Sequence, residues 1–118
     1  MAFLTKALRR FTSRVALAGG FRTATLTGDE TLTHLSAQFQ ALDPGGASRD
    51  VTLTAESTGE GGYFFVFFNT ADAAENLVVK DAGGSTIATV PENGWGIVYQ
   101  TTAGAWAQLA VVTASGVA

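Results

Sequence analysis

The chain contains no cysteine and a single histidine, His34, which narrows the chemistry available to it. Without cysteine there are no disulfides and no thiolate metal sites, so stability has to come from packing. His34 lies in the alternating stretch 31–35 and no nucleophile motif accompanies it, so we expect an ordinary surface or strand position rather than a catalytic base or a zinc ligand. The sequence therefore predicts a non-enzymatic protein with no cofactor and no metal site.

Charged residues are also scarce, at 14% of the 118 residues, against a usual fraction of about 25%. No apolar run approaches the roughly 20 residues that a membrane-spanning helix needs, so an integral membrane protein is not expected. At 47% hydrophobic the chain has enough apolar surface to fold, and its length fits one domain. The many threonines and valines and the 14 glycines favour strands joined by tight turns.

Acidic residues are absent from the first 22 positions, which hold five of the seven basic residues. All ten acids follow, from Asp29 onward, against only Arg49 and Lys80, so residues 23–118 carry a formal charge of −8. We therefore divide the chain into a basic N-terminal arm, residues 1–22, and an acidic domain, residues 23–118. Such asymmetry predicts that the arm meets an acidic surface.

Within residues 1–18 the apolar side chains recur at spacings of three and four, and Gly19-Gly20 follows. This pattern predicts an amphipathic helix with a glycine stop. Its apolar side is formed by Phe3, Leu4, Ala7, Leu8, Phe11, Val15 and Ala18, and its polar side includes Lys6, Arg9, Arg10 and Ser13. An extended arm that a partner orders is the alternative. A secretory signal fits poorly, because the apolar run 15–21 is short and Arg22 ends it.

From residue 23 onward short alternating runs are separated by turn residues, which is typical of an antiparallel β-sandwich or barrel. Turn signals such as Asp43-Pro44-Gly45-Gly46 and Ala82-Gly83-Gly84 suit chain reversal, because proline fixes φ and glycine permits positive φ. We predict a single antiparallel, jelly-roll-like domain of about eight strands, at residues 23–27, 31–42, 50–54, 62–69, 76–81, 85–90, 95–101 and 105–113.

The run Tyr63-Phe64-Phe65-Val66-Phe67-Phe68 breaks the alternation. Successive strand residues point to opposite faces, so this strand is apolar on both. One face can be the core of the domain, and the other then needs the N-terminal helix or a neighbouring subunit, since large exposed apolar patches are uncommon on monomers. A central strand covered by its own domain is the alternative.

Other candidate sites in the sequence are weak. Glu56 and Glu60 lack the aromatic platforms of a glycosidase, and residues 59–62 lack the lysine and the strand–loop–helix context of a phosphate loop. Residues 81–84 lack the regular oxygen ligands of a calcium loop. Trp95 and Trp106 each follow a turn and begin a strand, which favours a core or seam position whose indole N–H finds a local acceptor. Carbohydrate stacking or partner contact is the alternative role.

Two further alternatives concern the arm. Five positive charges favour a nucleic-acid-binding structural protein with salt-sensitive affinity. The acidic body and the grouping of Phe3 and Phe11 on one face oppose that function, so a nucleic-acid partner is not expected. The same amphipathic pattern allows a membrane-surface helix, but we predict no membrane partner.

Several blocks of residues 26–109 resemble small β-structured virion proteins of tailed bacteriophages, especially head-decoration (capsid cement) proteins and related fibre domains. The resemblance rests on residues 42–53 (LDPGGASRDVTL), 67–70 (FFNT), 77–81 (LVVKD), 85–94 (STIATVPENG) and 104–106 (GAW). Such proteins form trimers on the outer surface of the phage head and tie capsomers together. Tail-fibre relatives differ in having long repetitive shafts, which this chain lacks.

The resemblance implies a homotrimeric decoration protein that binds the major capsid protein, on the outside of the virion, with no small-molecule substrate. A receptor- or glycan-binding fibre module is the alternative. For binding to the capsid we predict an apolar and basic set of arm residues, Phe3, Leu8, Arg9, Arg10, Phe11 and Arg14. For the subunit interface we predict four aromatic residues, Phe65, Phe67, Trp95 and Trp106.

Overall fold

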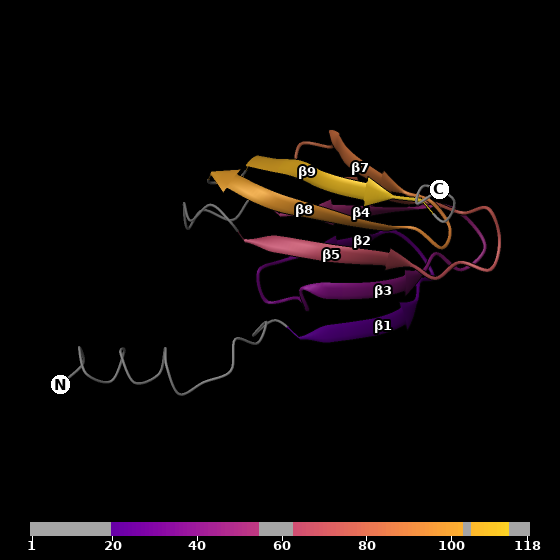
Figure 1. Cartoon of the computed structure of the whole chain (residues 1–118). Helices are drawn as coiled ribbons and strands as arrows, with labels where there is room; N and C mark the ends of the chain where they lie inside the picture. Colours follow the sequence, from indigo (N-terminus) through magenta and orange to yellow (C-terminus); the bar gives the residue numbers. More distant parts are fainter. Residues whose placement is uncertain (1–19, 55–62, 103–104, 114–118) are drawn as a thin grey trace, which may run out of the picture.

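The computed structural model describes residues 20–54, 63–102 and 105–113, and this part of the chain is all-β, as predicted (Figure 1). It forms nine strands: β1 Phe21–Thr25, β2 Glu30–Leu32, β3 Phe39–Asp43, β4 Arg49–Leu53, β5 Phe64–Asn69, β6 Leu77–Lys80, β7 Thr86–Val90, β8 Trp95–Thr102 and β9 Ala105–Val112. Seven of the eight predicted strands match one observed strand each, within two residues at either end.

The strands form two sheets that pack face to face. One sheet has five strands in the order β1-β3-β5-β8-β9, and the other has four in the order β2-β4-β6-β7. From β1 to β6 the chain crosses from one sheet to the other after every strand, so it winds through both sheets like a short coil. Figure 1 shows the five-stranded sheet in front, with β2, β4 and β7 behind it.

The prediction of a single antiparallel sandwich or barrel is wrong, because both sheets are mixed. β1 pairs with β3, β3 with β5, β2 with β4 and β4 with β6, all in parallel. Parallel neighbours need a crossover connection, and here the crossover is a strand of the opposite sheet. Strand periodicity does not indicate which strands pair, so the parallel pairing could not be predicted from the sequence pattern.

The antiparallel part lies in the second half of the chain. β6 and β7 form the predicted hairpin, in which Gly84 has φ +90° and its N–H donates to the carbonyl of Asp81 at 3.0 Å. β8 pairs with both β5 and β9 in antiparallel fashion. The strong turn signal at residues 82–84 was thus sufficient to predict this hairpin.

The predicted strand over residues 31–42 is also wrong, since it is two strands in different sheets, β2 and β3. The turn between them contains neither glycine nor proline. Instead Ser36 N–H donates to the carbonyl of Thr33 at 2.9 Å, and Thr33 N–H donates to Ser36 Oγ at 3.0 Å. Serine and threonine hydroxyls stabilise such turns by bonding to the nearby backbone, a weaker signal than glycine or proline.

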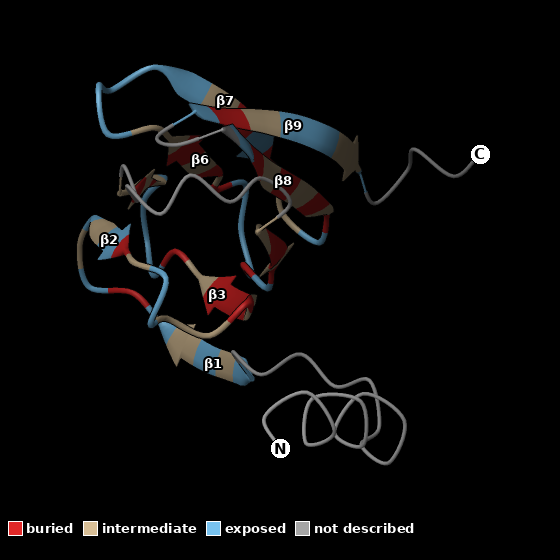
Figure 2. Ribbon diagram, turned by 90° about the vertical axis from the view of Figure 1, so that its left-hand side faces the viewer, coloured by how far each residue is buried: buried red, intermediate tan, exposed pale blue. Residues whose placement is uncertain are grey.

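The hydrophobic core fills the space between the two sheets (Figure 2). The five-stranded sheet contributes Leu42, Phe65, Phe67, Val98 and Trp106 to the core. The four-stranded sheet contributes Leu32, Val51, Leu53, Leu77, Val79, Ala88 and Val90. The Trp106 indole N–H donates to the carbonyl of Thr54 at 3.3 Å, which confirms the expected local acceptor. One face of the phenylalanine-rich strand β5 is therefore the core.

An ion pair joins the two sheets where the edge strands β1 and β2 lie. Arg22 donates through both Nη atoms to the Glu30 carboxylate, at 2.6 Å each, and through Nη1 to Gln40 Oε1 at 3.1 Å. These hydrogen bonds raise the pKa of Arg22 and lower the pKa of Glu30. Phe21 and Arg22, which we placed at the end of the basic arm, thus belong to the sheet, and Arg22 is neutralised there.

Candidate functional site: the outward face of the five-stranded sheet

The outward face of the five-stranded sheet carries large apolar side chains on every strand, beside the exposed Thr23 and Thr25 of β1. The register places on one side of the sheet every second residue of each strand, beginning with the paired Phe21 and Phe39. We call this surface the aromatic face; its large apolar members are Phe21, Phe39, Phe64, Val66, Phe68, Trp95, Ile97, Tyr99, Leu109 and Val112. In Figure 1 no other described element lies in front of it.

Three phenylalanines form a continuous stack across the first half of the aromatic face. The Phe21 and Phe39 ring centroids lie 6.1 Å apart with the rings stacked, and Phe39 and Phe68 stack at 6.4 Å. Phe21 remains 64% exposed at the edge of this stack. Aromatic rings are large contributors to interface energy, so an exposed stack of this kind is a strong candidate contact surface.

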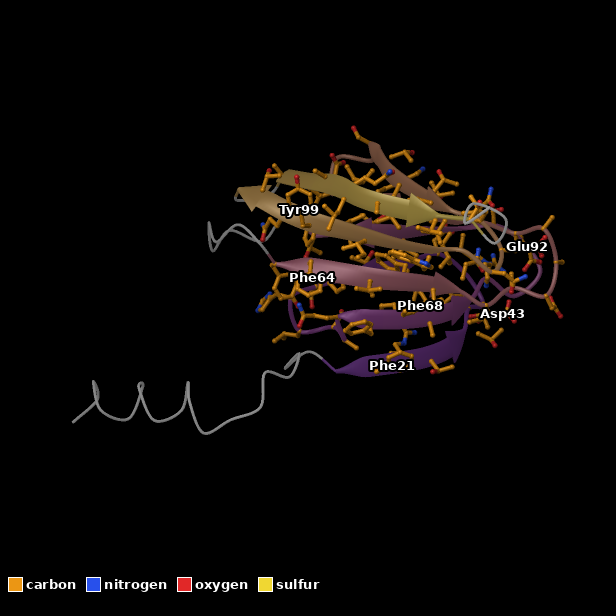
Figure 3. The ribbon with its side chains drawn as sticks, viewed as in Figure 1. Phe21, Asp43, Phe64, Phe68, Glu92 and Tyr99 are labelled. Carbon is orange, nitrogen blue, oxygen red and sulfur yellow. The ribbon has the colours of Figure 1, made fainter. Side chains whose placement is uncertain are left out.

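The second half of the aromatic face is hollowed. Phe64, Ile97, Tyr99 and Leu109 line an open hollow of about 460 Å³ over strands β5, β8 and β9. The extra residue of the β-bulge between Ile97 and Val98 on the β9 side is Leu109, which is 64% exposed. Figure 3 shows Phe64 and Tyr99 at this end, with Phe68 and Phe21 farther along the same sheet. The hollow has the shape to receive an apolar side chain from a neighbour.

The outward face of the four-stranded sheet is chemically different. By the strand register its residues are Thr31, Asp50, Thr52, Val78, Lys80, Thr86 and Thr89. Lys80 Nζ and Asp50 Oδ2 form an ion pair across it at 2.9 Å. On the aromatic face, by contrast, the outward strand positions of the described chain include one charged residue, Asp43, at the end of β3. The aromatic face thus suits contact with another apolar surface, and the outward face of the four-stranded sheet suits contact with water.

The four residues predicted for the subunit interface fall into two groups. Phe65 and Phe67 are 1% and 0% exposed, and Trp106 is 8% exposed, so all three belong to the core of the chain itself. Trp95 lies on the aromatic face, opposite Phe68. The residues predicted for capsid binding, Phe3, Leu8, Arg9, Arg10, Phe11 and Arg14, lie outside the described residues.

Sequence reasoning identified β5 as a two-faced strand but did not identify which of its phenylalanines point outward. Phe64 and Phe68 do, and β8 presents Ile97 and Tyr99 beside them. The signal available was the second two-faced run, residues 95–99, in which Gly96 and Val98 alternate with three large apolar residues. Two such runs pairing with each other predict one apolar outward face, whichever register they adopt.

No protein-family model matches the chain, and no curated protein matches it in sequence. Across the described ranges there is no helix with the length and apolar character needed to cross a membrane. The aromatic face is accordingly the feature of the molecule on which a functional argument rests.

Proposed function

We propose that this protein is a structural assembly protein, whose copies associate through the aromatic face into a closed homotrimer that decorates the outer surface of a tailed-phage head. The observation that carries the self-association is the continuous apolar face with its exposed Phe21 and Leu109. The resemblance of the sequence to head-decoration proteins supports the trimer and the capsid as partner. Closed symmetry buries the face in every copy and avoids open-ended growth.

The width of the aromatic face favours a second copy over the chain's own N-terminal arm as its occupant. Five strands spaced by about 4.8 Å give a face roughly 19 Å across. A single helix with its side chains is about 10–12 Å wide, so the helix predicted for residues 1–18 would leave about half of the face open. In a closed trimer two neighbouring copies, one against the Phe21–Phe39–Phe68 half and one against the hollow half, would cover the full width.

Charge favours the same occupant. The body carries a formal charge of −8, so two copies repel each other over most of their surfaces. Asp43 is the one charged outward residue on the described strands of the aromatic face, and it lies at the end of the sheet in Figure 3. The basic arm finds almost no acid to pair with there. The copies of a trimer can therefore meet through this face with little charge repulsion.

Attachment to the capsid is proposed through the arm. Phe3, Leu8 and Phe11 would anchor it in an apolar groove of the major capsid protein, and Arg9, Arg10 and Arg14 would add complementary charge. Buried aromatic anchors contribute more to binding than exposed ion pairs, roughly 2 kcal/mol or more against under about 1. Arg22 pairs with Glu30, so one of the five positive charges counted for the arm is neutralised within the domain, which weakens the alternative of a nucleic-acid partner.

The trimer is tested by light scattering of the full chain over a concentration series. The expected mass is three times the chain mass of 12.2 kDa. Replacing Leu109 with Ser, at an exposed position of the hollow, should shift the midpoint of assembly to at least about tenfold higher concentration. Thr89→Ala, also exposed but on the opposite outward face, is the control and should assemble as the natural chain does. A chain that stays monomeric at millimolar concentration would refute self-association.

The capsid assignment has its own test. Particles of the parent phage lacking this protein are mixed with the full chain, and binding is measured by cosedimentation. Phe11→Ser together with Leu8→Ser should reduce binding at least about 30-fold while leaving the trimer intact. Undiminished binding would remove the arm from the interface, and absence of the protein from purified parent particles would overturn the virion assignment.

A further inference from the structure

Three carboxylates converge at the end of the molecule where the chain passes from β3 and β5 toward the four-stranded sheet. Asp43 is the last residue of β3, and Asp72 and Glu75 lie in the loop between β5 and β6. One carboxylate oxygen from each lies within 4.8 Å of those from the other two. Figure 3 shows Asp43 at this end of the sheet. The three carboxylates could not be recognised as a group from the sequence, because they come from two separate segments.

Glu75 is the buried member of the cluster and has an unsatisfied carboxylate oxygen. This residue is only 8% exposed, and its Oε1 is buried without a hydrogen-bond partner. Among the residues that the structure describes, it is the one buried side-chain nitrogen or oxygen left unsatisfied. A buried carboxylate oxygen without a donor is unfavourable, and two further carboxylates beside it make it more so. The site therefore calls for a positively charged partner.

The loop that presents Glu75 is held in place by hydrogen bonds. Asn69 Nδ2 donates to the carbonyls of Glu75 and Val90, at 2.8 and 2.9 Å, and Asn69 Oδ1 accepts from Ala71 N–H at 3.0 Å. Asn76 N–H donates to Ser48 Oγ at 2.9 Å. The buried Asn69 thus fixes the backbone on which the carboxylate stands. Glu75 is accordingly not a loop residue that simply turns toward water.

Asp43 is fixed on the other side of the cluster. Its Oδ1 accepts from Gly45 N–H at 2.9 Å, in the turn where Gly45 has φ +78°. A Cβ at Gly45 would lie 2.2 Å from the carbonyl oxygen of Leu26, so only glycine fits there. This single hydrogen bond leaves the Asp43 carboxylate with free lone pairs for a further ligand.

No described cation neutralises the cluster. Arg49 begins β4, in the opposite sheet from Asp43, and its Nε donates to the carbonyl of Pro44 at 2.9 Å. The ion pairs found in the described chain involve Glu30 and Asp50, and none joins Arg49 or Lys80 to Asp43, Asp72 or Glu75. Three carboxylates therefore gather here without a counter-ion among the described residues.

We propose that Asp43, Asp72 and Glu75 bind a calcium ion. Calcium is a hard cation that takes carboxylate, carbonyl and water oxygens at about 2.3–2.6 Å, so two ligands of one ion lie at most about 5 Å apart. The observed spacing of the three oxygens satisfies that limit. Magnesium keeps several water ligands and is usually bound by one or two carboxylates, so three protein carboxylates at one site favour calcium. The bound ion would join the end of β3 to the β5–β6 loop and give Glu75 its missing partner.

The test is thermal unfolding of the full chain, stripped with EDTA and then supplied with 10 mM CaCl₂ or MgCl₂. Calcium should raise the Tm by at least about 4 °C, and magnesium by less than half as much. Glu75→Gln should abolish the response to calcium. In EDTA, however, Glu75→Gln should melt at the same temperature as the natural chain or higher, because it removes a buried, unpaired charge.

Asp81→Asn is the matched control, since Asp81 Oδ1 also accepts one backbone N–H in a turn, from Ser85 at 2.9 Å, but lies outside the cluster. This variant should keep the full calcium response. Asp72→Asn, at an exposed position, should weaken calcium binding at least about tenfold in titration calorimetry, and it serves if Glu75→Gln fails to fold. An unchanged Tm in calcium, or an equal response in Glu75→Gln, would overturn the site; an equal response to magnesium would overturn the assignment to calcium.

Discussion

The two outward faces of this molecule are built on sheets of similar size and yet differ completely in chemistry. The four-stranded sheet presents threonines and the Lys80–Asp50 ion pair, with Val78 as its one large apolar outward residue. The five-stranded sheet presents ten large apolar residues, six of them on the neighbouring strands β5 and β8. Both sheets bury an apolar inner face in the same core. Core formation therefore explains the inner faces but not the aromatic face.

The aromatic face is not a by-product of a hydrophobic composition, because the other outward face of the same chain is mostly polar. Sheets with one solvated face ordinarily alternate apolar and polar residues, as β4 does here from Asp50 to Leu53. β5 departs from this rule at every position from Phe64 to Phe68, and β8 departs at three of its outward positions. Exposed apolar surface of this extent usually marks a binding surface.

The difference between inner and outer positions is tested most strongly on β5 itself. Phe67 is fully buried in the core, whereas its neighbour Phe68 points outward. We expect Phe67→Ala to lower the free energy of unfolding by about 3–5 kcal/mol, because it leaves a cavity. Phe68→Ala should lower that of the dilute monomer by less than about 1.5 kcal/mol, because most of its ring faces the outer surface. Urea unfolding at low micromolar concentration measures both, and equal losses would show that the aromatic face is covered within one chain.

The next test places a lysine on each of the two outward faces in turn. Ile97 and Val78 are matched, since each is a β-branched, half-buried outward residue on an interior strand of its sheet. Ile97→Lys should weaken self-association by about 2–4 kcal/mol per contact, or roughly 30-fold to 1,000-fold, because it buries an unpaired charge. Val78→Lys should leave association unchanged. Sedimentation velocity over a concentration series separates the two, and parallel losses would point to general destabilisation instead.

The sequence predicted the strands much better than the way they pair. Alternation and turn residues located seven strands, and the Ala82-Gly83-Gly84 signal located a hairpin. The division of residues 31–42 was missed because Thr33 and Ser36 close a turn through their hydroxyls, without glycine or proline. Parallel pairing was missed because it depends on contacts between segments far apart in the chain, for example Phe39 opposite Val66.

The candidate site was predictable as a surface but not as a set of residues. A strand with phenylalanine on both faces needs cover on both, and this reasoning identified β5 as part of a contact surface. It could not decide which side faces the core, because a shift of one residue in register exchanges the two faces. Phe65 and Phe67 were therefore selected where Phe64 and Phe68 lie on the surface. The carboxylate cluster depends even more on the fold, since Asp43 is 29 residues from Asp72 along the chain.

The smallest expected effect concerns the Arg22–Glu30 pair, which joins the edges of the two sheets behind their outward faces. Glu30→Gln should lower the free energy of unfolding at pH 7 by only about 1 kcal/mol, because about a third of each side chain is exposed. Hydrogen bonds from Arg22, more than the Coulomb attraction of its charge, lower the pKa of Glu30, against the opposing effect of burial. A lowered carboxyl pKa stabilises the fold above the pKa of the unfolded chain, near ~4.3.

That stabilisation is lost as the pH falls below about 4.3 and through the lower pKa of Glu30 in the folded chain. The natural chain and Glu30→Gln should therefore differ most in denaturant unfolding at pH 7, and the difference should shrink as the pH falls through the lowered pKa of Glu30. Convergence would show that the pair contributes through its charge. A difference that does not shrink with falling pH would mean that the substitution disturbs the packing of β1 and β2 instead, and the edge of the aromatic face at Phe21 would then depend on that packing more than on the ion pair.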